Sequence, residues 1–408
     1  MSARILIGIG GGIAAYKVCE VISALVKSGA EVKAILTPAA EKFITPLTLT
    51  TLCRQPVYTD ESLWSPWHSR PLHIELGEWA DVMVLAPLTA NTLAKLVTGF
   101  ADNLLTNVVL ASSMPILVAP AMNTTMWEHA VVQRNWDQLL ADPRYHAIGP
   151  GVGLLACDTV GDGRMAEPSD LLSYIQSLGV TKGKRDLIGK HLLISTGSTR
   201  EHLDPVRFIG NPASGKMGQA LALAAWHRGA EVELIQAWVA TPLRPETHLT
   251  TLAVTSAAEL QSAMLAAFPQ ADWTIMAAAV GDVKPAQYFT EKLPKHSLPN
   301  DLPLQPIPDI LAELGQHKQG HQRLIGFAAQ TGEIVSPAQE KLKHKQLDAI
   351  VANPIDQAQS GFGSDRNQGI FIDVRGHQVP IPLCSKLHMA HQLLDLICDL
   401  ETDLSRIA

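Results

Sequence analysis

The chain has 408 residues, more than one ordinary hydrophobic core holds, and its 47% hydrophobic and 17% charged residues exclude an intrinsically disordered protein. The formal net charge of −7, with no long block of Lys and Arg, argues against a nucleic-acid partner and favours small molecules. No stretch approaches the roughly 20 apolar residues of a membrane span, and five widely spaced cysteines without a C-x-x-C pair predict a reduced, cytoplasmic protein.

The first half alternates apolar runs with helical patterns, which predicts a parallel sheet that helices cover on both faces. We expect strands at residues 5–9, 32–36, 82–86, 116–119 and 145–149. We expect helices at residues 14–27, 90–97, 103–111 and 131–140. The glycine-rich stretch at residues 151–165 has few apolar anchors, and its composition predicts a mobile lid.

The second half repeats this alternation after a polar stretch at residues 181–186. We expect strands at 192–195, 232–235, 273–278, 324–328 and 349–352 and helices at 219–228, 257–268 and 337–345. Residues 370–374 should form a hairpin with 379–382, and the proline-rich stretch at 293–308 should be an irregular loop. The predicted fold class is α/β, with two Rossmann-like three-layer domains that have mainly parallel sheets. The domains would span residues 1–182 and 190–408, with residues 183–189 as the linker.

Each half begins with a strand, a glycine-rich turn and a helix, an arrangement in which backbone N–H groups can bind phosphate. Residues 8–12 form the first turn, and Gly197 followed by Ser214-Gly215-Lys216 forms the second. Neither turn matches the dinucleotide fingerprint, because Ile13 stands where the third glycine would be and Gly197 has no partner at the right spacing. A mononucleotide or a single phosphate is therefore favoured over NAD. The alternative is a tight turn without a ligand.

Three side chains of the first half could carry chemistry. His73 could act as a base, Asn123 follows a predicted strand where parallel sheets line ligand crevices, and Cys157 in the predicted lid could deliver a proton. Each also has an ordinary interpretation, as a hydrogen-bonded histidine, a helix cap or a buried thiol. His388 and His391 are the nearest approach to a metal-ligand pair, but a solvated helix face is favoured because no carboxylate or cysteine stands beside them.

Several short motifs, in this order, resemble those of the flavin-containing cysteine decarboxylases: Gly-Gly-Ile-Ala-Ala-Tyr-Lys at 11–17, His-Ile-Glu-Leu-Gly at 73–77, Ala-Pro-Leu-Thr-Ala-Asn-Thr at 86–92, Pro-Ala-Met-Asn-Thr-Thr-Met-Trp at 120–127 and Gly-Arg-Met at 163–165. The motifs at 199–207 and 214–218 are similar to those of a ligase family. Nearly the whole chain resembles the bacterial fusion of phosphopantothenoylcysteine decarboxylase with phosphopantothenate–cysteine ligase, a family of coenzyme A synthesis.

For the first half, the resemblance implies FMN-dependent decarboxylation of 4′-phosphopantothenoylcysteine. Transient oxidation of the substrate thiol by FMN would provide an electron sink for the departing carboxylate. His73 would be the base, Asn123 would hold the carboxylate and Cys157 would supply a proton. The resemblance assigns the flavin to Gly11, Gly12, Ile13, Thr37, Phe43, Thr89, Ala90 and Asn91, of which the last three belong to a motif that approaches flavin across a subunit contact. It assigns substrate to Met122, Arg164 and Met165.

For the second half, the resemblance implies that CTP with Mg²⁺ activates 4′-phosphopantothenate as an acyl-cytidylate, which the amine of cysteine then attacks. Asn211 would position this intermediate, and Lys292 would stabilise the charge that develops as it forms. The positions that match CTP contacts are Met276, Ala277, Ala278, Asp282, Lys292, Pro308, Asp309, Ile310, Leu311, Phe327, Lys341 and Lys345. Arg207, Ser214, Gly215 and Lys216 would bind substrate. Without the resemblance, the Ser-Gly-Lys turn and the Lys341–Lys345 helix face are equally well explained as solvated surface.

The chain departs from the family pattern at Gly10, where relatives often carry serine, and in the second half at Pro212, Ala213, Gly281, Lys284 and Gln330. Two alternative functions remain: a flavin-dependent decarboxylase of peptidyl cysteine, and a non-catalytic flavin-binding protein. The resemblance also implies a homo-oligomer with trimeric decarboxylase contacts and dimeric ligase contacts, which together make a dodecamer.

Overall fold

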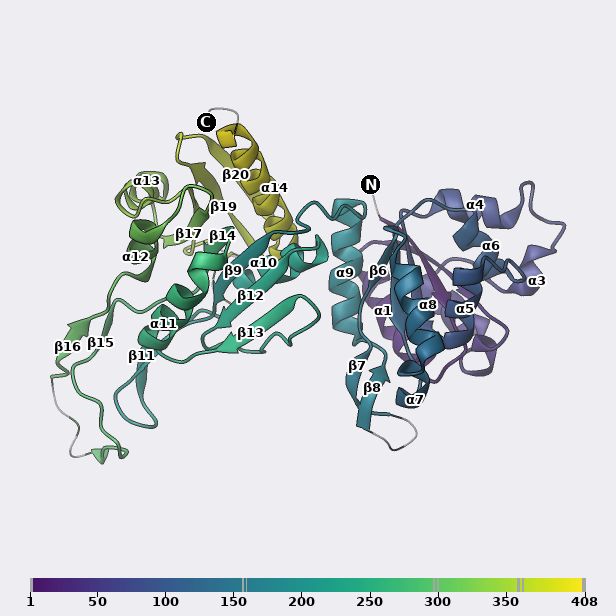
Figure 1. Cartoon of the computed structure of the whole chain (residues 1–408), viewed down its shortest axis with the longest axis horizontal. Coiled ribbons are helices and arrows are strands. Elements are labelled where there is room, and N and C mark those ends of the chain that lie inside the picture. Colours follow the sequence, from purple (N-terminus) through teal and green to yellow (C-terminus); the bar gives the residue numbers. More distant parts are fainter. Residues whose placement is uncertain are drawn as a thin grey trace. The chain divides into compact units, whose positions relative to one another are not determined.

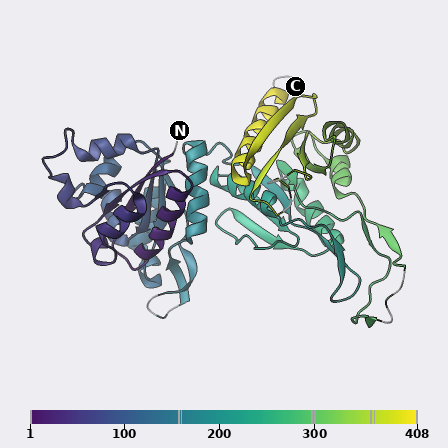
Figure 2. The same cartoon turned by 180° about the vertical axis from the view of Figure 1, so that it is seen from behind.

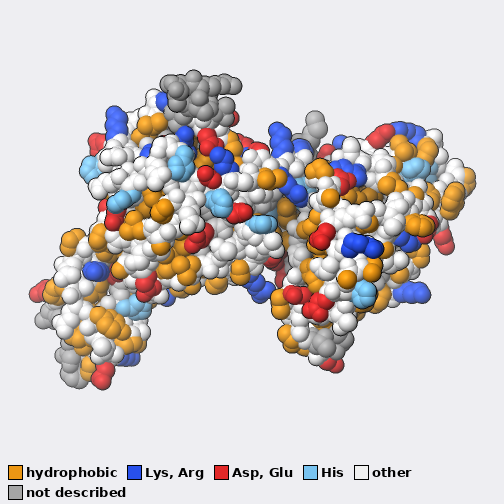
Figure 3. Space-filling model, in the orientation of Figure 1, with side chains coloured by type: hydrophobic (Ala, Val, Ile, Leu, Met, Phe, Trp, Pro, Cys, Tyr) orange, Lys and Arg blue, Asp and Glu red, His pale blue; other side chains and the backbone are white. Residues whose placement is uncertain are grey.

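The computed structural model describes residues 3–155, 158, 160–295, 298, 301–357, 360–361 and 363–405. The chain divides into two compact units, Met1–Lys184 and Arg185–Ala408 (Figure 1). Within the described ranges, no helix combines the length and the apolar character needed to cross a lipid bilayer. On the face of the molecule in Figure 3, acidic and basic side chains are interspersed.

The first unit is built on a six-stranded parallel sheet with the strand order β3-β2-β1-β4-β5-β6. The strands are β1 (Arg4–Ile9), β2 (Glu31–Leu36), β3 (Val57–Tyr58), β4 (Val82–Leu88), β5 (Ile116–Pro120) and β6 (Tyr145–Ala147). The central strands are apolar and buried except for Arg4 at the start of β1, as both-face burial of a parallel sheet requires. A separate antiparallel hairpin, β7 (Gly151–Leu154) with β8 (Val160–Arg164), follows the sheet.

Helices cover both faces of this sheet. Alternate strand residues such as Leu6, Met83 and Val118 pack with α4 (Leu72–Trp79), α5 (Ala90–Thr98), α6 (Leu104–Leu110) and α8 (Ala130–Leu140). The other face is covered by α1 (Ala15–Lys27) and α9 (Pro168–Thr181). Figure 1 shows α5 and α8 in front of the sheet, and Figure 2, from behind, shows α1 in front. The remaining short helices are η1 (Ala40–Lys42), α2 (Pro46–Cys53), α3 (Asp60–Leu63) and α7 (Thr124–Trp127).

The second unit has an eight-stranded sheet with the order β13-β12-β9-β14-β17-β18-β19-β20. The first six strands in this order are parallel: β13 (Leu249–Ala253), β12 (Glu231–Gln236), β9 (His191–Thr196), β14 (Trp273–Met276), β17 (Arg323–Gln330) and β18 (Ala349–Pro354). The antiparallel pair β19 (Arg366–Asp373) and β20 (Gln378–Ser385) closes one edge. Two small ribbons lie outside the sheet: β10 (Arg200–His202) with β11 (Phe208–Gly210), and β15 (Val283–Pro285) with β16 (Leu304–Pro306).

The large sheet also separates two helical layers. One face packs on α10 (Lys216–His227) and α14 (Lys386–Ser405), with Trp273 fully buried between them. The opposite face packs on α11 (Ala257–Ala267), η2 (Phe268–Gln270), α12 (Ile310–His317) and α13 (Val335–His344). The prediction of two Rossmann-like three-layer α/β units with mainly parallel sheets is therefore confirmed.

Several local expectations were incomplete or wrong. Within the predicted mobile lid at 151–165, residues 151–154 and 160–164 pair as the β7–β8 hairpin, so the segment has regular structure; its mobility stays a prediction, and residues 156, 157 and 159 lie outside the described residues. Part of the proline-rich loop, Leu304–Pro306, pairs with β15, because an edge ribbon tolerates proline. His391 is 1% exposed, and burial lowers its pKa to about 4, so it lies in the core and not on a solvated face.

Candidate active sites

In both units the strand order reverses at one point, and parallel sheets bind ligands at the carboxyl ends of the strands beside such a point. In the first unit the chain leaves β1 toward β2 on one side and resumes with β4 on the other. In the second unit it leaves β9 toward β12 and resumes with β14. Each unit has a cavity at this position.

The first cavity is bounded by a turn that has no room for side chains. The N–H of Gly10 donates to the carbonyl of Pro87 at 3.2 Å, and a Cβ on Gly10 would lie 2.5 Å from that oxygen. A Cβ on Gly11 would lie 2.3 Å from the Cβ of Ala39. No side chain caps the following helix α1, but its first three N–H groups already donate to backbone carbonyls three residues earlier. An anion at this end of the helix would therefore meet the N–H groups of the glycine turn itself. Relatives often carry serine where this chain has Gly10, but in this structure the turn lies too close to β4 to leave room for a serine side chain.

The first cavity has a volume of about 700 Å³. The predicted site residues that line it are Gly11, Gly12, Ile13, Thr89, Ala90, Met122, Asn123, Arg164 and Met165. Thr89 and Ala90 reach it from the same chain as the glycine turn, so they need no subunit contact to do so. Asn123 is also a helix cap, because its Oδ1 accepts the N–H of Thr125 at 2.9 Å at the start of α7.

Other predicted residues of the first unit do not line this cavity. The buried Thr37 hydroxyl donates to the carbonyl of Ile9 at 3.2 Å, below the turn. Phe43 is 49% exposed, and Asn91 is exposed on α5. His73 is half-buried on α4, and its buried Nδ1 has no hydrogen-bond partner among the described residues. Cys157 lies outside the described residues.

A charged cluster beside this cavity was missed by the sequence reasoning. Lys17 lines the cavity, and its Nζ contacts the Glu167 carboxylate at 3.2 Å. Arg164 contacts the same carboxylate at 2.9 Å. Two cations therefore share one carboxylate at the cavity wall, which leaves a positive charge for an anionic substrate. Arg164 was expected to bind substrate and Lys17 ends the glycine motif, but nothing in the sequence indicated that Glu167 joins them.

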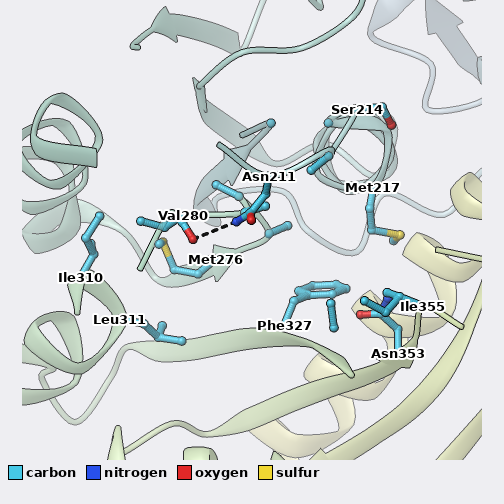
Figure 4. Close-up of a pocket in the computed structure, with 18 of the residues that line it drawn as sticks. Asn211, Ser214, Met217, Met276, Val280, Ile310, Leu311, Phe327, Asn353 and Ile355 are labelled. Carbon is cyan, nitrogen blue, oxygen red and sulfur yellow. Dashed lines mark hydrogen bonds between the residues drawn. The ribbon is translucent and has the colours of Figure 1, made fainter. Parts of the chain in front are cut away.

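The second cavity, of about 550 Å³, gathers most of the predicted ligase residues (Figure 4). These are Asn211, Ser214, Gly215, Lys216, Met276, Ala277, Ala278, Asp282, Pro308, Asp309, Ile310, Leu311, Phe327 and Lys345. The departures Ala213 and Gly281 also line it. At Gly281 a Cβ would meet nothing closer than 3.5 Å, so glycine is not required there sterically.

Backbone contacts hold Asn211 in this cavity. Its N–H donates to the Ser198 hydroxyl at 3.1 Å, and its Nδ2 donates to the Val280 carbonyl at 3.1 Å, the dashed line in Figure 4. Gly215 directly precedes α10 and has a φ of +81°, and a Cβ there would lie 2.3 Å from Val239. A side chain is therefore excluded twice at Gly215, by conformation and by space. The N-terminus of α10, like that of α1, has no side-chain cap.

Asp309 and Lys345 form an ion pair at the wall of the second cavity, with Nζ and Oδ2 2.8 Å apart. Asp309 also caps α12 by accepting the N–H of Ala312 at 3.0 Å. Burial raises the pKa of this carboxyl, but the hydrogen bonds from Lys345 and Ala312 outweigh it and hold the pKa below its usual value. By contrast, Lys341 is exposed on α13 and Lys292 is exposed on a loop, and neither lines the cavity.

Arg207 belongs to a clamp beside the loop that carries Lys292. Its Nη1 donates to the Asp204 carboxylate at 2.8 Å and to the carbonyl of Leu293 at 3.1 Å. Asp204, which has no exposed surface, accepts the N–H groups of Val206, Arg207 and Leu293 at 2.8, 2.8 and 3.2 Å. Both backbone groups of Leu293 are thus held, which anchors the loop next to Lys292 while the Lys292 side chain stays exposed.

We expect Asp204→Asn to release this loop, because an amide NH₂ would face a backbone donor. Burial alone would raise the pKa of Asp204, but three backbone N–H groups and Arg207 hold the pKa below its usual value. Its stabilising effect is therefore complete above about pH 4 and is lost as the pH falls further. The variant should lower the Tm above pH 4, flatten the acid limb of the stability curve, and reduce ligation about tenfold by misplacing the loop. Asp301→Asn, an exposed change on the same loop, should leave the Tm, the acid limb of the stability curve and the ligation rate unchanged.

Lys386, Asn353 and Asn367 also line the second cavity and were missed. They come from β18, β19 and α14, far along the chain from the glycine turn, and no motif contains them. The two cavities, each with a glycine turn and an uncapped helix at a strand-order reversal, define a two-domain α/β protein with a candidate ligand site in each half.

Comparison with known proteins identifies the family. Residues 1–179 match the model described as flavoprotein, and residues 187–400 match that of the DNA/pantothenate metabolism flavoprotein C-terminal domain. A crystal structure of the C-terminal domain of coenzyme A biosynthesis bifunctional protein CoaBC is 35% identical and covers 54% of this chain and 98% of its own, with a TM-score of 0.45. The CoaBC proteins of Bacillus subtilis and Vibrio cholerae are 41% and 39% identical over 397 residues, 97% of each chain. The chain belongs to the CoaBC family of bifunctional coenzyme A biosynthesis proteins.

Proposed function

We propose that the two units of this bifunctional coenzyme A biosynthesis enzyme catalyse consecutive reactions. Residues 190–408 would join 4′-phosphopantothenate to cysteine with CTP, and residues 1–182 would decarboxylate the product to 4′-phosphopantetheine, with residues 183–189 as the linker. The observation that carries this proposal is that each unit has its own cavity, lined by the motif residues of the corresponding reaction.

The first cavity fits the phosphate end of FMN. Gly10 and Gly11 have no space for a Cβ, so the backbone of this turn leaves room for one phosphate to approach the N–H groups of Gly11 and Gly12. Gly12, Ile13, Thr89 and Ala90 would line the flavin, with Thr37 supporting the turn from below. When bound, flavin supplies a reversible two-electron oxidation of the substrate's cysteine carbon, which makes loss of CO₂ possible.

The residues of the first cavity would bind the substrate and move its protons. Asn123 would orient the substrate carboxylate, with Met122 and Met165 beside it. The hydrogen bond from the N–H of Thr125 holds the Asn123 side chain in place. Lys17 and Arg164 supply positive charge for the anionic substrate. Cys157 would return a proton to the substrate carbon. His73, the proposed base, does not line the cavity of its own chain; in the proposed oligomer, a second subunit would bring it there.

In the second cavity, an oxygen of the 4′-phosphopantothenate carboxylate would attack the α-phosphorus of CTP, and pyrophosphate would leave. The amine of cysteine would then attack the acyl carbon, and CMP would leave. Asn211 would hold the acyl-cytidylate, and the apolar wall of Met276, Ile310, Leu311 and Phe327 would take the nucleoside. Lys292 does not line the cavity in this structure, so its side chain would have to swing toward the nucleotide from the loop that the clamp at Leu293 anchors.

Mg²⁺ would accompany CTP. No cluster of three or more His, Cys, Asp or Glu side chains with metal-binding geometry occurs within the described residues. That is compatible with a nucleotide-borne Mg²⁺, which keeps several waters and needs at most one or two protein carboxylates besides phosphate.

We also propose a cytoplasmic site of action and a dodecamer. Among the described residues, no disulfide joins Cys19, Cys53, Cys384 or Cys398, as a reducing compartment permits.

Mass spectrometry of products tests this function. The full chain with 4′-phosphopantothenate, cysteine, CTP and Mg²⁺ should yield 4′-phosphopantetheine, CO₂ and pyrophosphate. Without CTP, only added 4′-phosphopantothenoylcysteine should be converted. Conversion of a peptide with a C-terminal cysteine, without CTP-dependent pyrophosphate release, would favour the peptidyl-cysteine decarboxylase instead. A yellow protein that produces neither CO₂ nor pyrophosphate would favour a binding protein.

A further inference from the structure

A buried lysine lies at the end of the second cavity away from the proposed nucleoside wall. Lys386 is the first residue of α14, is 7% exposed, and lines the cavity together with Asn353 and Asn367. Figure 4 shows Phe327 near the middle of the cavity, with Ile310 and Leu311 on one side and Asn353 and Ile355 on the other. The apolar wall and the end with the two amides are therefore opposite each other.

The charge on Lys386 is poorly compensated. Its Nζ donates to the Gly361 carbonyl at 3.3 Å, although an ammonium has three N–H groups to share. The neighbouring carboxylate, Asp365, is engaged by Lys216 at 2.5 Å, and its side chain is 86% exposed. Two ammonium groups thus share one solvated carboxylate, which leaves a net positive charge at this wall of the cavity.

This arrangement costs stability in the absence of an anion. Burial, assisted by Lys216 and opposed by Asp365, lowers the pKa of Lys386 to about 8. A buried cation is retained at neutral pH only at the expense of folding free energy, unless an anion neutralises it. The N-terminus of α10, which begins at Lys216 and has no side-chain cap, faces the same cavity and adds the positive end of its dipole.

We propose that Lys386 is a phosphate-binding residue of the ligase cavity, acting with Lys216 and the N-terminus of α10. The inference rests on the proposed ligase function only for the source of the phosphate, which is either the triphosphate of the nucleotide or the phosphate ester of the acyl substrate. Both are polyanions with tetrahedral oxygens that accept charge-assisted hydrogen bonds from an ammonium.

Calorimetry on the full chain with inorganic tripolyphosphate and with inorganic phosphate tests the proposal. Lys386→Met should weaken the binding of at least one of these anions by roughly ten- to a hundredfold, the loss expected for one hydrogen bond to a charged group. Lys386→Arg, which keeps the charge, should retain most of the affinity. Lys343→Met, which removes an exposed lysine of α13 outside the cavity, should bind both anions as the wild type does. Unchanged binding of both anions by Lys386→Met would overturn the proposal.

Two further readouts separate phosphate binding from a structural role. If Lys386 only held the Gly361 carbonyl, Lys386→Met would lower the Tm of the ligand-free protein. The proposal instead predicts an unchanged or higher Tm at pH 7, because a buried charge is removed. The affinity of the wild type for the anion should also fall above about pH 8 relative to that of Lys386→Arg, whose side chain stays charged. A lower Tm together with no pH difference would overturn the proposal.

Steady-state kinetics then identifies the source of the phosphate. A rise in KM for CTP assigns the contact to the triphosphate, and a rise in KM for 4′-phosphopantothenate assigns it to the substrate's ester. Either result supports the proposal. If the wild type forms no ligated product while Lys386 still governs tripolyphosphate binding, the proposed ligase fails and the phosphate site stands. If ligation proceeds and Lys386→Met changes neither KM nor anion binding, the phosphate site fails and the ligase stands.

Discussion

Gly12→Val should give a folded protein that purifies without the yellow colour of flavin. Gly12 lines the first cavity, and a Cβ there would meet only Cγ of Pro87, at 3.8 Å. Its φ is outside the positive region, so the backbone accepts valine. The added methyl groups therefore enter the space proposed for FMN without disturbing the fold. Overpacking of this kind costs about 1–3 kcal/mol, which lowers the affinity for FMN roughly ten- to a hundredfold.

The measurement is FMN affinity by flavin fluorescence, with decarboxylation of supplied 4′-phosphopantothenoylcysteine as the second readout. The ligase unit is an internal control, because CTP-dependent ligation should remain at the wild-type rate. Gly179→Ala is the matched glycine control: Gly179 lies within α9, a Cβ there meets nothing within 4 Å, and the change should leave flavin bound. If Gly12→Val binds FMN as tightly as the wild type, the flavin is not held at this turn.

Asn211→Asp should abolish most ligation while leaving decarboxylation intact. The Nδ2 of Asn211 donates to the Val280 carbonyl at 3.1 Å, and an aspartate oxygen in its place would face that carbonyl without a proton. The new negative charge would also repel the anionic acyl-cytidylate. The variant would also lose the hydrogen bond by which the Asn211 amide would hold this anion. Loss of a hydrogen bond to a charged group costs about 1.5–3 kcal/mol, so formation of ligated product should fall at least tenfold, and further because of the repulsion.

Pyrophosphate and 4′-phosphopantothenoylcysteine should be measured separately in this variant. If Asn211 holds the intermediate, product should fall more than pyrophosphate release, because activation precedes the attack of cysteine. Asn211→Ala, which removes the donor without adding charge, should have the smaller effect. Equal product formation by Asn211→Asp and the wild type would contradict the assigned position. Conversion of supplied 4′-phosphopantothenoylcysteine on the same preparation checks that the protein is folded.

Sequence patterns were sufficient where the signal is local. Apolar runs between turn residues predict most central strands of both sheets, because a strand that is buried on both faces must be apolar throughout. The motifs around Gly11, Asn123 and Ser214 follow individual strands, and strand ends in a parallel sheet meet at one edge. The cavities therefore contain most of the residues that those motifs contribute.

What the sequence by itself determined was the α/β class, the two turns that exclude side chains, and the family. Only the tertiary structure decided which distant side chains share a cavity. It placed Lys386 beside Lys216, paired Lys345 with Asp309, joined Lys17 and Arg164 through Glu167, and left His73 outside the first cavity. The physical reason is that charge pairing and burial depend on the distances between segments that are far apart in the sequence. Only the packed sheet brings these segments together, and the pattern of apolar residues along the chain does not give those distances.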